Sequence, residues 1–139
     1  MVVMVSRGNN VSDANKVISI ADDGLGDLTG LVRDFARIRD WDRFHSPRNL
    51  LLALVGEVGE LAAEFQWIDD EAVAQQLTKE QMRSGVGSEL ADILSYLLRL
   101  ADVLGIDLVA EFKAKIILNE SRYPVNRSKG SSAKYTAYE

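Results

Sequence analysis

Two segments of this chain combine a long apolar helical pattern with a pair of acidic residues spaced three apart. The first segment carries Glu57 and Glu60, and the second carries Glu89 and Asp92. Residues three apart share one face of an α-helix, with roughly 5–6 Å between their Cβ atoms, so both acids of a pair can bind the same cation. An apolar face normally excludes charge, and buried acids need a positive partner. The pattern predicts two packed helices with carboxylates facing each other.

The sequence around the first pair supplies no positive side chain. No lysine or arginine occurs between Arg48 and Lys79, although that stretch holds six acidic residues: Glu57, Glu60, Glu64, Asp69, Asp70 and Glu71. This asymmetry favours a divalent cation as the partner. The alternative, that the acids are solvated residues of amphipathic helices, as most glutamates are, stays open at this point.

The composition limits which metal ions can bind and excludes several kinds of site. The chain has no cysteine, which rules out disulfide scaffolds, thiolate zinc sites and cysteine nucleophiles. Its single histidine, His45, rules out sites that need two imidazoles. A di-iron carboxylate bundle is disfavoured as well, because it draws its histidines from Glu-x-x-His repeats. The remaining oxygen ligands favour Mg²⁺, with Mn²⁺ as the alternative.

Charge and hydropathy limit the partners. A formal net charge of −5 argues against a protein that binds nucleic acid by covering phosphates with lysine and arginine. The apolar run at residues 1–5 is too short for a signal peptide, and no apolar stretch approaches the thickness of a bilayer. We expect a cytoplasmic protein without nucleic-acid or membrane partners.

Helical periodicity dominates the sequence and predicts an all-α fold, a bundle of four to five helices. Residues 1–24 show no sustained period, and we interpret them as a flexible leader. The helical domain is expected over residues 25–126. Residues 127–139 form a tail rich in Ser and Lys, a composition that orders only when something binds it.

The first two helices have recognisable limits. An apolar stripe that starts at Leu28 predicts a first helix ending near Trp41. Ser46 is a typical N-cap, and Pro47 suits the first helical position because its missing N–H costs nothing there. The second helix is predicted from Pro47 to about Ile68.

The second half of the chain predicts two further helices. Residues 69–78 are interpreted as a connection, with Thr78 and Gln81 forming a capping box for a third helix. That helix is predicted to end at Gly105, because glycine adopts the left-handed backbone conformation that terminates helices.

The fourth helix is predicted from Leu108, capped by Asp107, to Arg122, where Pro124 prevents its continuation. The polar and basic residues that share one of its faces are Lys115, Asn119 and Arg122.

A distinctive motif precedes the first acid pair: residues 39–50 read Arg-Asp-Trp-Asp-Arg-Phe-His-Ser-Pro-Arg-Asn-Leu. With the segments that follow it, this motif closely resembles the dCTP pyrophosphatases of the MazG-like all-α nucleotide pyrophosphatase superfamily. The two acid pairs match the E-x-x-E…E-x-x-D metal motif of that family. The resemblance extends over residues 28–136, through matches at Tyr96, Lys115, Asn119, Arg122-Tyr123-Pro124 and Lys134-Tyr135.

The resemblance implies an Mg²⁺-dependent homotetrameric hydrolase. Its expected reaction cleaves a deoxynucleoside triphosphate, either dCTP or a modified or related pyrimidine nucleotide, to the monophosphate and pyrophosphate, which would sanitise the nucleotide pool. The implied metal ligands are Glu57, Glu60, Glu89 and Asp92. Either Glu60 or Glu64 is expected to act as the general base that activates water.

The resemblance also implies a set of substrate-binding residues. Trp41 and Trp67 are expected to form the walls of the base pocket, with His45 as a further pocket residue and Tyr96 as a contact to the sugar. On the fourth helix, Asn119 is expected to read the base, and Lys115 and Arg122 to contact the triphosphate. Each has an alternative: core packing for the aromatic residues, a contact at the helix start for His45, and solvent exposure for the residues of the fourth helix.

One position departs from the family pattern. Val32 stands three residues before Phe35, where the family leads us to expect a histidine. If that histidine reads the base in relatives, its replacement alters cytosine selectivity before it affects hydrolysis, and a broader substrate range follows.

A catalytically idle module that senses nucleotides or binds a partner through the same acidic groove is the second hypothesis. The presence of every metal acid favours the enzyme.

Overall fold

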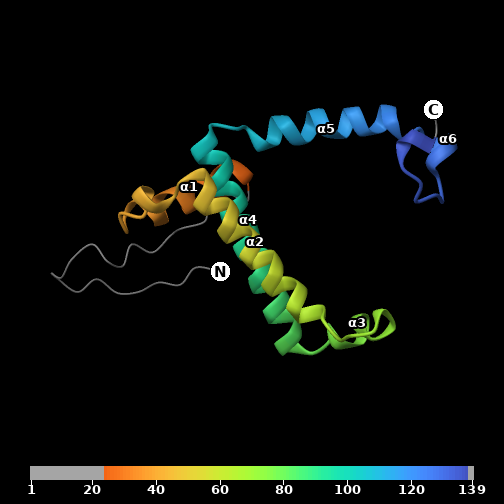
Figure 1. The fold of residues 1–139 in the computed structure, drawn as a ribbon, viewed down its shortest axis with the longest axis horizontal. Coiled ribbons are helices and arrows are strands. Elements are labelled where there is room, and N and C mark those ends of the chain that lie inside the picture. Colours follow the sequence, from red (N-terminus) through yellow and green to blue (C-terminus); the bar gives the residue numbers. More distant parts are fainter. Residues whose placement is uncertain (1–23, 138–139) are drawn as a thin grey trace.

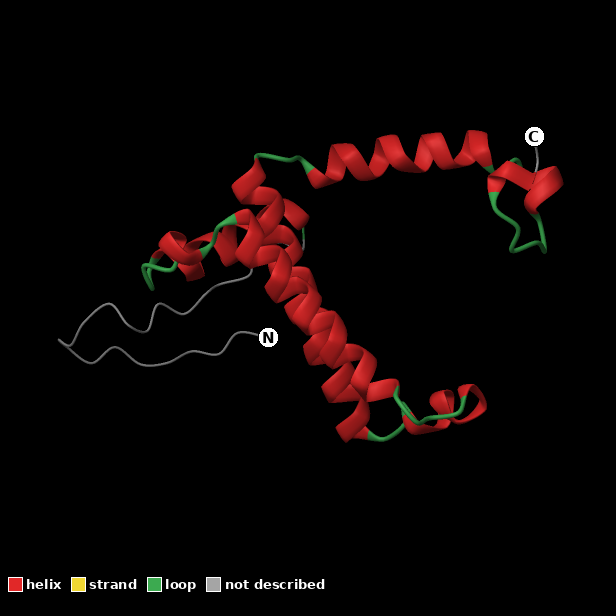
Figure 2. Ribbon diagram, in the orientation of Figure 1, coloured by secondary structure: helices red, strands yellow, loops and turns green. Residues whose placement is uncertain are grey.

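The structure is a computed structural model that describes residues 24–137. Over this range the chain forms six α-helices, two short 3₁₀ helices and no strand, so the predicted all-α class is confirmed (Figure 2). The leader expected at residues 1–24 lies, except for its last residue, outside the described residues. No helix in the described part is both long and apolar enough to cross a bilayer.

Helix α1 (Leu25–Arg37) ends earlier than the apolar stripe predicts. The backbone leaves the helix and reverses at Asp40, whose φ is 55°. The N–H of Trp41 then donates to the carbonyl of Ala36 at 3.0 Å. This reversal brings the Trp41 indole edge-on against the Phe35 ring, with 5.7 Å between centroids.

Helix α2 (Pro47–Phe65) begins where predicted, and the Ser46 hydroxyl accepts a hydrogen bond from the N–H of Asn49 at 3.2 Å. The helix ends before Ile68: the backbone leaves the helical conformation at Gln66, with ψ 131°, and Trp67 then adopts a left-handed backbone with φ 70°. As a result Trp67 extends into solvent with 93% of its surface exposed.

The segment predicted as a connection contains a short helix, α3 (Asp70–Gln76), whose first turn carries Asp70 and Glu71. Acidic residues in a first turn interact favourably with the helix dipole. The predicted capping box is wrong: Lys79 occupies the N-cap of the next helix, and the Thr78 hydroxyl donates to the carbonyl of Gln75 at 2.6 Å.

Both remaining helix limits agree with the sequence. Helix α4 (Glu80–Leu104) ends at Gly105, which has φ 66°. Asp107 caps helix α5 (Leu108–Arg122), since its Oδ1 accepts from the N–H groups of Val109 and Ala110, each at 3.0 Å. Helix α6 (Val125–Ser128) and a 3₁₀ turn (Tyr135–Ala137) follow.

The helices pack around one antiparallel pair. Helices α2 and α4 lie side by side along their lengths, and α1 packs on α4 near the end of that pair (Figure 1). Helices α3 and α5 project from opposite ends of the pair (Figure 1). Within residues 24–137 the buried core is small and comprises Ala36, Leu50, Leu98, Arg99 and Ala101.

A large apolar surface therefore remains uncovered in one chain. On α2, Leu52 is 59% exposed, and on α5 Phe112 and Ile117 are 66% and 69% exposed. Large apolar side chains exposed in this number often mark a site of association.

The α1–α4 contact is fixed by an ion-pair network at Asp102. Arg33 on α1 donates to this carboxylate, and so does Arg99 of α4 through Nη1 at 2.6 Å. These hydrogen bonds, mainly that from Arg33, hold the pKa of Asp102 below its usual value of 3.8. The side chains of Asp102 and Arg99 are only 11% and 8% exposed, so solvent screens their interaction weakly.

We predict that Asp102→Asn lowers the free energy of unfolding by about 3 kcal/mol near neutral pH, because it removes the buried negative charge that pairs with both Arg33 and Arg99. The pKa of Asp102 is lower in the folded than in the unfolded protein, so this contribution is fully present above pH 3.8 and is lost as the pH falls through the folded-state value. Denaturant titrations of both proteins at equal protein concentration measure the difference as a function of pH.

The matched control is Asp34→Asn, which removes an exposed ion pair with Arg37. Such a pair contributes less than about 1 kcal/mol, so the control should change little. A difference between wild type and Asp102→Asn that stays constant as the pH drops below 3.8 would contradict the prediction.

Candidate active site

Helices α2 and α4 bring three acidic side chains together. Carboxylate oxygens of Glu57 and Glu60 on α2 and of Glu89 on α4 all lie within 4.8 Å of one another. Asp92 lies one turn further along α4, where its charge acts on Glu57. Three of the four predicted acids therefore form one interhelical cluster, and the charge of the fourth, Asp92, acts on it.

The cluster carries uncompensated negative charge. Partial burial raises the pKa of Glu57, and the neighbouring charges of Glu60, Asp92 and Glu89 raise it further. The Oε2 atom of Glu89 is buried and has no hydrogen-bond partner among the residues that the structure describes. Within residues 24–137, none of these acids forms an ion pair with a basic side chain.

This arrangement fits a hard divalent cation. A buried carboxylate oxygen without a donor is destabilising unless a positive group satisfies it. The donor set consists of carboxylate oxygens only, which suits Mg²⁺ or Mn²⁺. The residues that could hold the ion are the three clustered glutamates and Asp92.

Glu64 occupies a different place from the cluster. Its carboxylate lies against α4 at Gly85, where a Cβ added to the glycine would meet the carboxylate at 3.2 Å. The missing side chain at Gly85 thus makes room for Glu64 between the helices. Glu64 does not belong to the group of three clustered acids.

A cavity of about 380 Å³ adjoins the acids, within the range of about 300–1,000 Å³ that is usual for ligand pockets. It lies between α1, the Trp41–His45 segment and α4. Its lining comprises Leu31, Val32, Phe35, Ala36, Trp41, His45, Asp92, Ser95, Tyr96 and Arg99. Because Asp92 belongs to both the cavity and the acid pair on α4, a ligand can reach both at once.

One wall of the cavity is aromatic. The Trp41 ring lies edge-on to both Phe35 and His45, with centroid distances of 5.7 and 6.3 Å. The structure therefore brings together three of the predicted substrate-binding residues, Trp41, His45 and Tyr96. Val32, the departure from the family pattern, lines the same cavity.

Arg99 is a site residue that the sequence analysis did not single out. Its Nη1 donates to Asp102, its Nη2 to Asp42, and its Nε to the Nδ1 of His45 at 3.1 Å. Burial lowers the pKa of His45, and the nearby guanidinium lowers it further against the opposing effect of Asp42. The available signal was spacing, since Arg99 shares the helical face of Asp92 and Tyr96.

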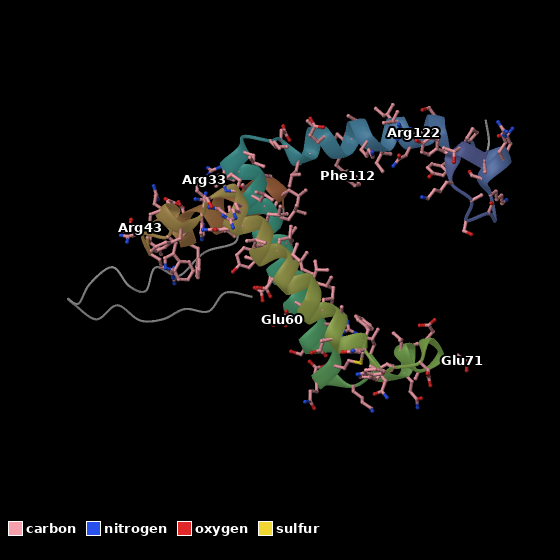
Figure 3. All side chains as sticks on the ribbon, in the orientation of Figure 1. Arg33, Arg43, Glu60, Glu71, Phe112 and Arg122 are labelled. Atoms are coloured by element: carbon pink, nitrogen blue, oxygen red, sulfur yellow. The ribbon has the colours of Figure 1, made fainter. Side chains whose placement is uncertain are left out.

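The other predicted substrate residues lie away from the acids in a single chain. Trp67 does not line the cavity and is almost fully exposed. Lys115, Asn119 and Arg122 lie on α5, which extends away from the α2–α4 pair (Figure 1). Figure 3 shows Arg122 far from Glu60, and its guanidinium lies over the Tyr135 ring at 4.7 Å from the centroid.

Relatives of the chain share this region. A model of the MazG-like family matches residues 53–137, which include both acid pairs. A bovine protein named dCTP pyrophosphatase 1 is 44% identical over 131 residues, covering 94% of this chain and 78% of the relative. Rat and human proteins of the same name are 48% and 46% identical over 112 residues, covering 81% of this chain and 66% of each relative.

A solved structure has the same architecture. The crystal structure of a pyrophosphatase from Archaeoglobus fulgidus DSM 4304 matches with a TM-score of 0.67 at 34% sequence identity. The match covers 78% of this chain and 99% of that one.

We predict that Mg²⁺ stabilises the folded protein and that Glu89→Gln removes this effect. A cation at about a hundredfold excess over its Kd adds about 2.7 kcal/mol to the free energy of unfolding. Without metal, the variant should melt at a slightly higher temperature, because one repelling charge is gone. Thermal melts with increasing Mg²⁺ measure both effects.

The control Glu111→Gln changes an exposed acid of α5 and should respond like wild type. An equal Mg²⁺ response in Glu89→Gln would exclude the interhelical cluster as the metal site.

Proposed function

The chain belongs to the MazG-like family, as its motifs predict, and we propose that it hydrolyses a deoxynucleoside triphosphate of the cytoplasmic pool to the monophosphate and pyrophosphate. The expected substrates are dCTP and modified or related pyrimidine nucleotides. The observation that supports this most is the interhelical acid cluster directly beside a base-sized, aromatic-walled cavity. Similarity to relatives named dCTP pyrophosphatase 1 favours a cytosine nucleotide.

The acids form the part of the site that meets the triphosphate. Glu57, Glu60, Glu89 and Asp92 would hold Mg²⁺, or Mn²⁺ in its place. When bound, the ion supplies positive charge that stabilises the phosphate oxygens and the leaving pyrophosphate. The cavity beyond Asp92 receives the base, which stacks on Trp41 and leaves Tyr96 to contact the sugar.

The general base is expected among the acids of α2. Glu60 lies in the cluster and is exposed, whereas Glu64 lies outside it against Gly85. A carboxylate that accepts a proton from water must keep a lone pair free of the metal. Glu64 meets this condition more readily, and Glu60 meets it if only one of its oxygens binds the ion.

We further propose that the functional enzyme is a homotetramer. Helix α5 exposes large apolar residues and carries the predicted phosphate and base contacts Lys115, Asn119 and Arg122 away from its own acids. A neighbouring copy can supply these residues to the cluster, and burying the exposed faces of Phe112 and Ile117 would stabilise that association. Trp67 is available to a second copy for the same reason.

Turnover assays of the four dNTPs with Mg²⁺ test the activity, and we predict the highest kcat/KM for dCTP. Of the two variants Glu60→Gln and Glu64→Gln, the one that lacks the general base should lose about 10²–10⁴-fold in kcat. If Glu64→Gln loses turnover but keeps the Mg²⁺-dependent rise in melting temperature, Glu64 is the base. Absence of turnover for every dNTP would instead leave a nucleotide-binding module without catalysis.

We predict that two inactive variants restore each other's activity. Glu60→Gln damages the acid cluster, and Arg122→Ala removes the proposed phosphate contact on α5. When the two chains are unfolded together and refolded, about a quarter of the sites in randomly mixed assemblies combine intact acids with an intact α5 from another copy. Pyrophosphate release measures the recovery. Mixed assemblies that remain inactive, identified by size-exclusion chromatography of differently tagged chains, would rule out a shared site.

A further inference from the structure

The buried guanidinium of Arg99 uses its donors in three directions. It forms ion pairs with Asp42 and Asp102 and donates a third hydrogen bond from Nε to Nδ1 of His45. Only 8% of its side chain is exposed, and Asp42 and Asp102 each accept from a different Nη atom. The direction of the Nε–H bond is therefore fixed by the surrounding ion pairs.

This contact determines which nitrogen of His45 carries the proton. A guanidinium has donors and no acceptor, so the Nδ1 atom that faces it must be unprotonated. In the neutral imidazole the proton then resides on Nε2. Burial and the positive charge of Arg99 lower the pKa of His45, which favours the neutral ring. Nε2 has no hydrogen-bond partner within the described residues, and the ring lines the cavity.

The cavity offers few other directional donors. Its α1 wall is apolar at Leu31, Val32 and Phe35, and the hydroxyl of Ser95 already donates to the carbonyl of Ala91 at 2.8 Å. Asp92 is an acceptor. A base that enters beside Trp41 therefore meets the Nε2–H of His45 as a fixed donor, together with the rotatable hydroxyl of Tyr96 and the indole N–H of Trp41.

We propose that Arg99 is a positioning residue that holds His45 as an Nε2–H donor, which selects nucleobases presenting a carbonyl oxygen, such as O2 of a pyrimidine. The inference rests on the proposed function, because it concerns the base end of the same substrate. A base that places no acceptor at that point leaves a partly buried donor unsatisfied, which disfavours it. Val32 cannot contribute a donor, so the reading of the base depends on the opposite wall.

The histidine proton can be observed directly, because His45 is the only histidine in the chain. Long-range ¹H–¹⁵N correlation spectra of ¹⁵N-labelled protein show one imidazole, and the two nitrogen shifts identify its tautomer. We expect the Nε2–H form in wild type and a mixture of tautomers in Arg99→Met. Arg99→Lys keeps a charged donor and should retain more of the Nε2–H form. The control Arg83→Met, an exposed position of the same helix, should match wild type. An Nδ1–H tautomer in wild type overturns the proposal whether or not any variant folds.

Substrate preference gives the second readout. Arg99→Met should lower kcat/KM for dCTP at least tenfold while changing that for dATP much less, so that the preference between them shrinks. His45→Phe should shrink it equally, and the double variant should add little, because both changes remove one donor. Equal losses for dCTP and dATP would mean that Arg99 only supports the fold, and would overturn the proposal. If no nucleotide is hydrolysed, the proposed function fails, whereas the tautomer spectra and the shift of Nε2 on titration with dCMP still decide the role of Arg99.

Discussion

The contact between α2 and α4 stabilises the fold by burying apolar residues and destabilises it by bringing acidic residues together. Apolar residues such as Leu50 and Leu98 bury surface between the two helices and draw them together. The same contact places Glu57, Glu60 and Glu89 within a few ångströms of one another, where their charges repel. Replacing the acids by apolar residues would relieve the repulsion and remove the proposed metal site. A bound cation converts this repulsion into attraction, so metal affinity and helix packing depend on each other.

The charged residues on the polar face of α4 form ion pairs at one end of the face and not at the other. At one end, Glu89 and Asp92 have no basic partner in the part of the chain that the structure describes. At the other end, Arg99 and Asp102 are neutralised by Asp42, by Arg33 and by each other. The paired end fixes α1 and the Trp41–His45 segment, and this pairing builds the cavity. The unpaired end is left for a ligand. Tyr96 lies between the two ends, where the base and phosphate parts of a nucleotide would meet.

Local chemistry determined which structural features could be predicted from the sequence. Helix limits that depend on a dedicated residue, such as Ser46, Gly105 and Asp107, were predicted correctly because each cap acts within a few residues. The helix ends at Arg37 and Phe65 were missed, because the residues that follow include no glycine or proline to signal the reversals at Asp40 and Trp67. The acid cluster could be foreseen from spacing, whereas the partner of His45 could not, since 54 residues separate it from Arg99.

The position of α5 could not be predicted from the sequence, for a different reason. Its sequence predicts the helix, both of its ends and the face that carries Lys115, Asn119 and Arg122. A pattern within one chain does not specify which copy of the acid cluster that face meets. The small core and the exposed apolar residues of α2 and α5 indicate that a single chain gains only part of its stability from its own contacts. If the missing part comes from association, folding, assembly and completion of the site become linked, and all three depend on protein concentration. Dilution would then lower activity per chain before it unfolds α2 and α4, because the residues of α5 leave the acid cluster while the interhelical pair persists.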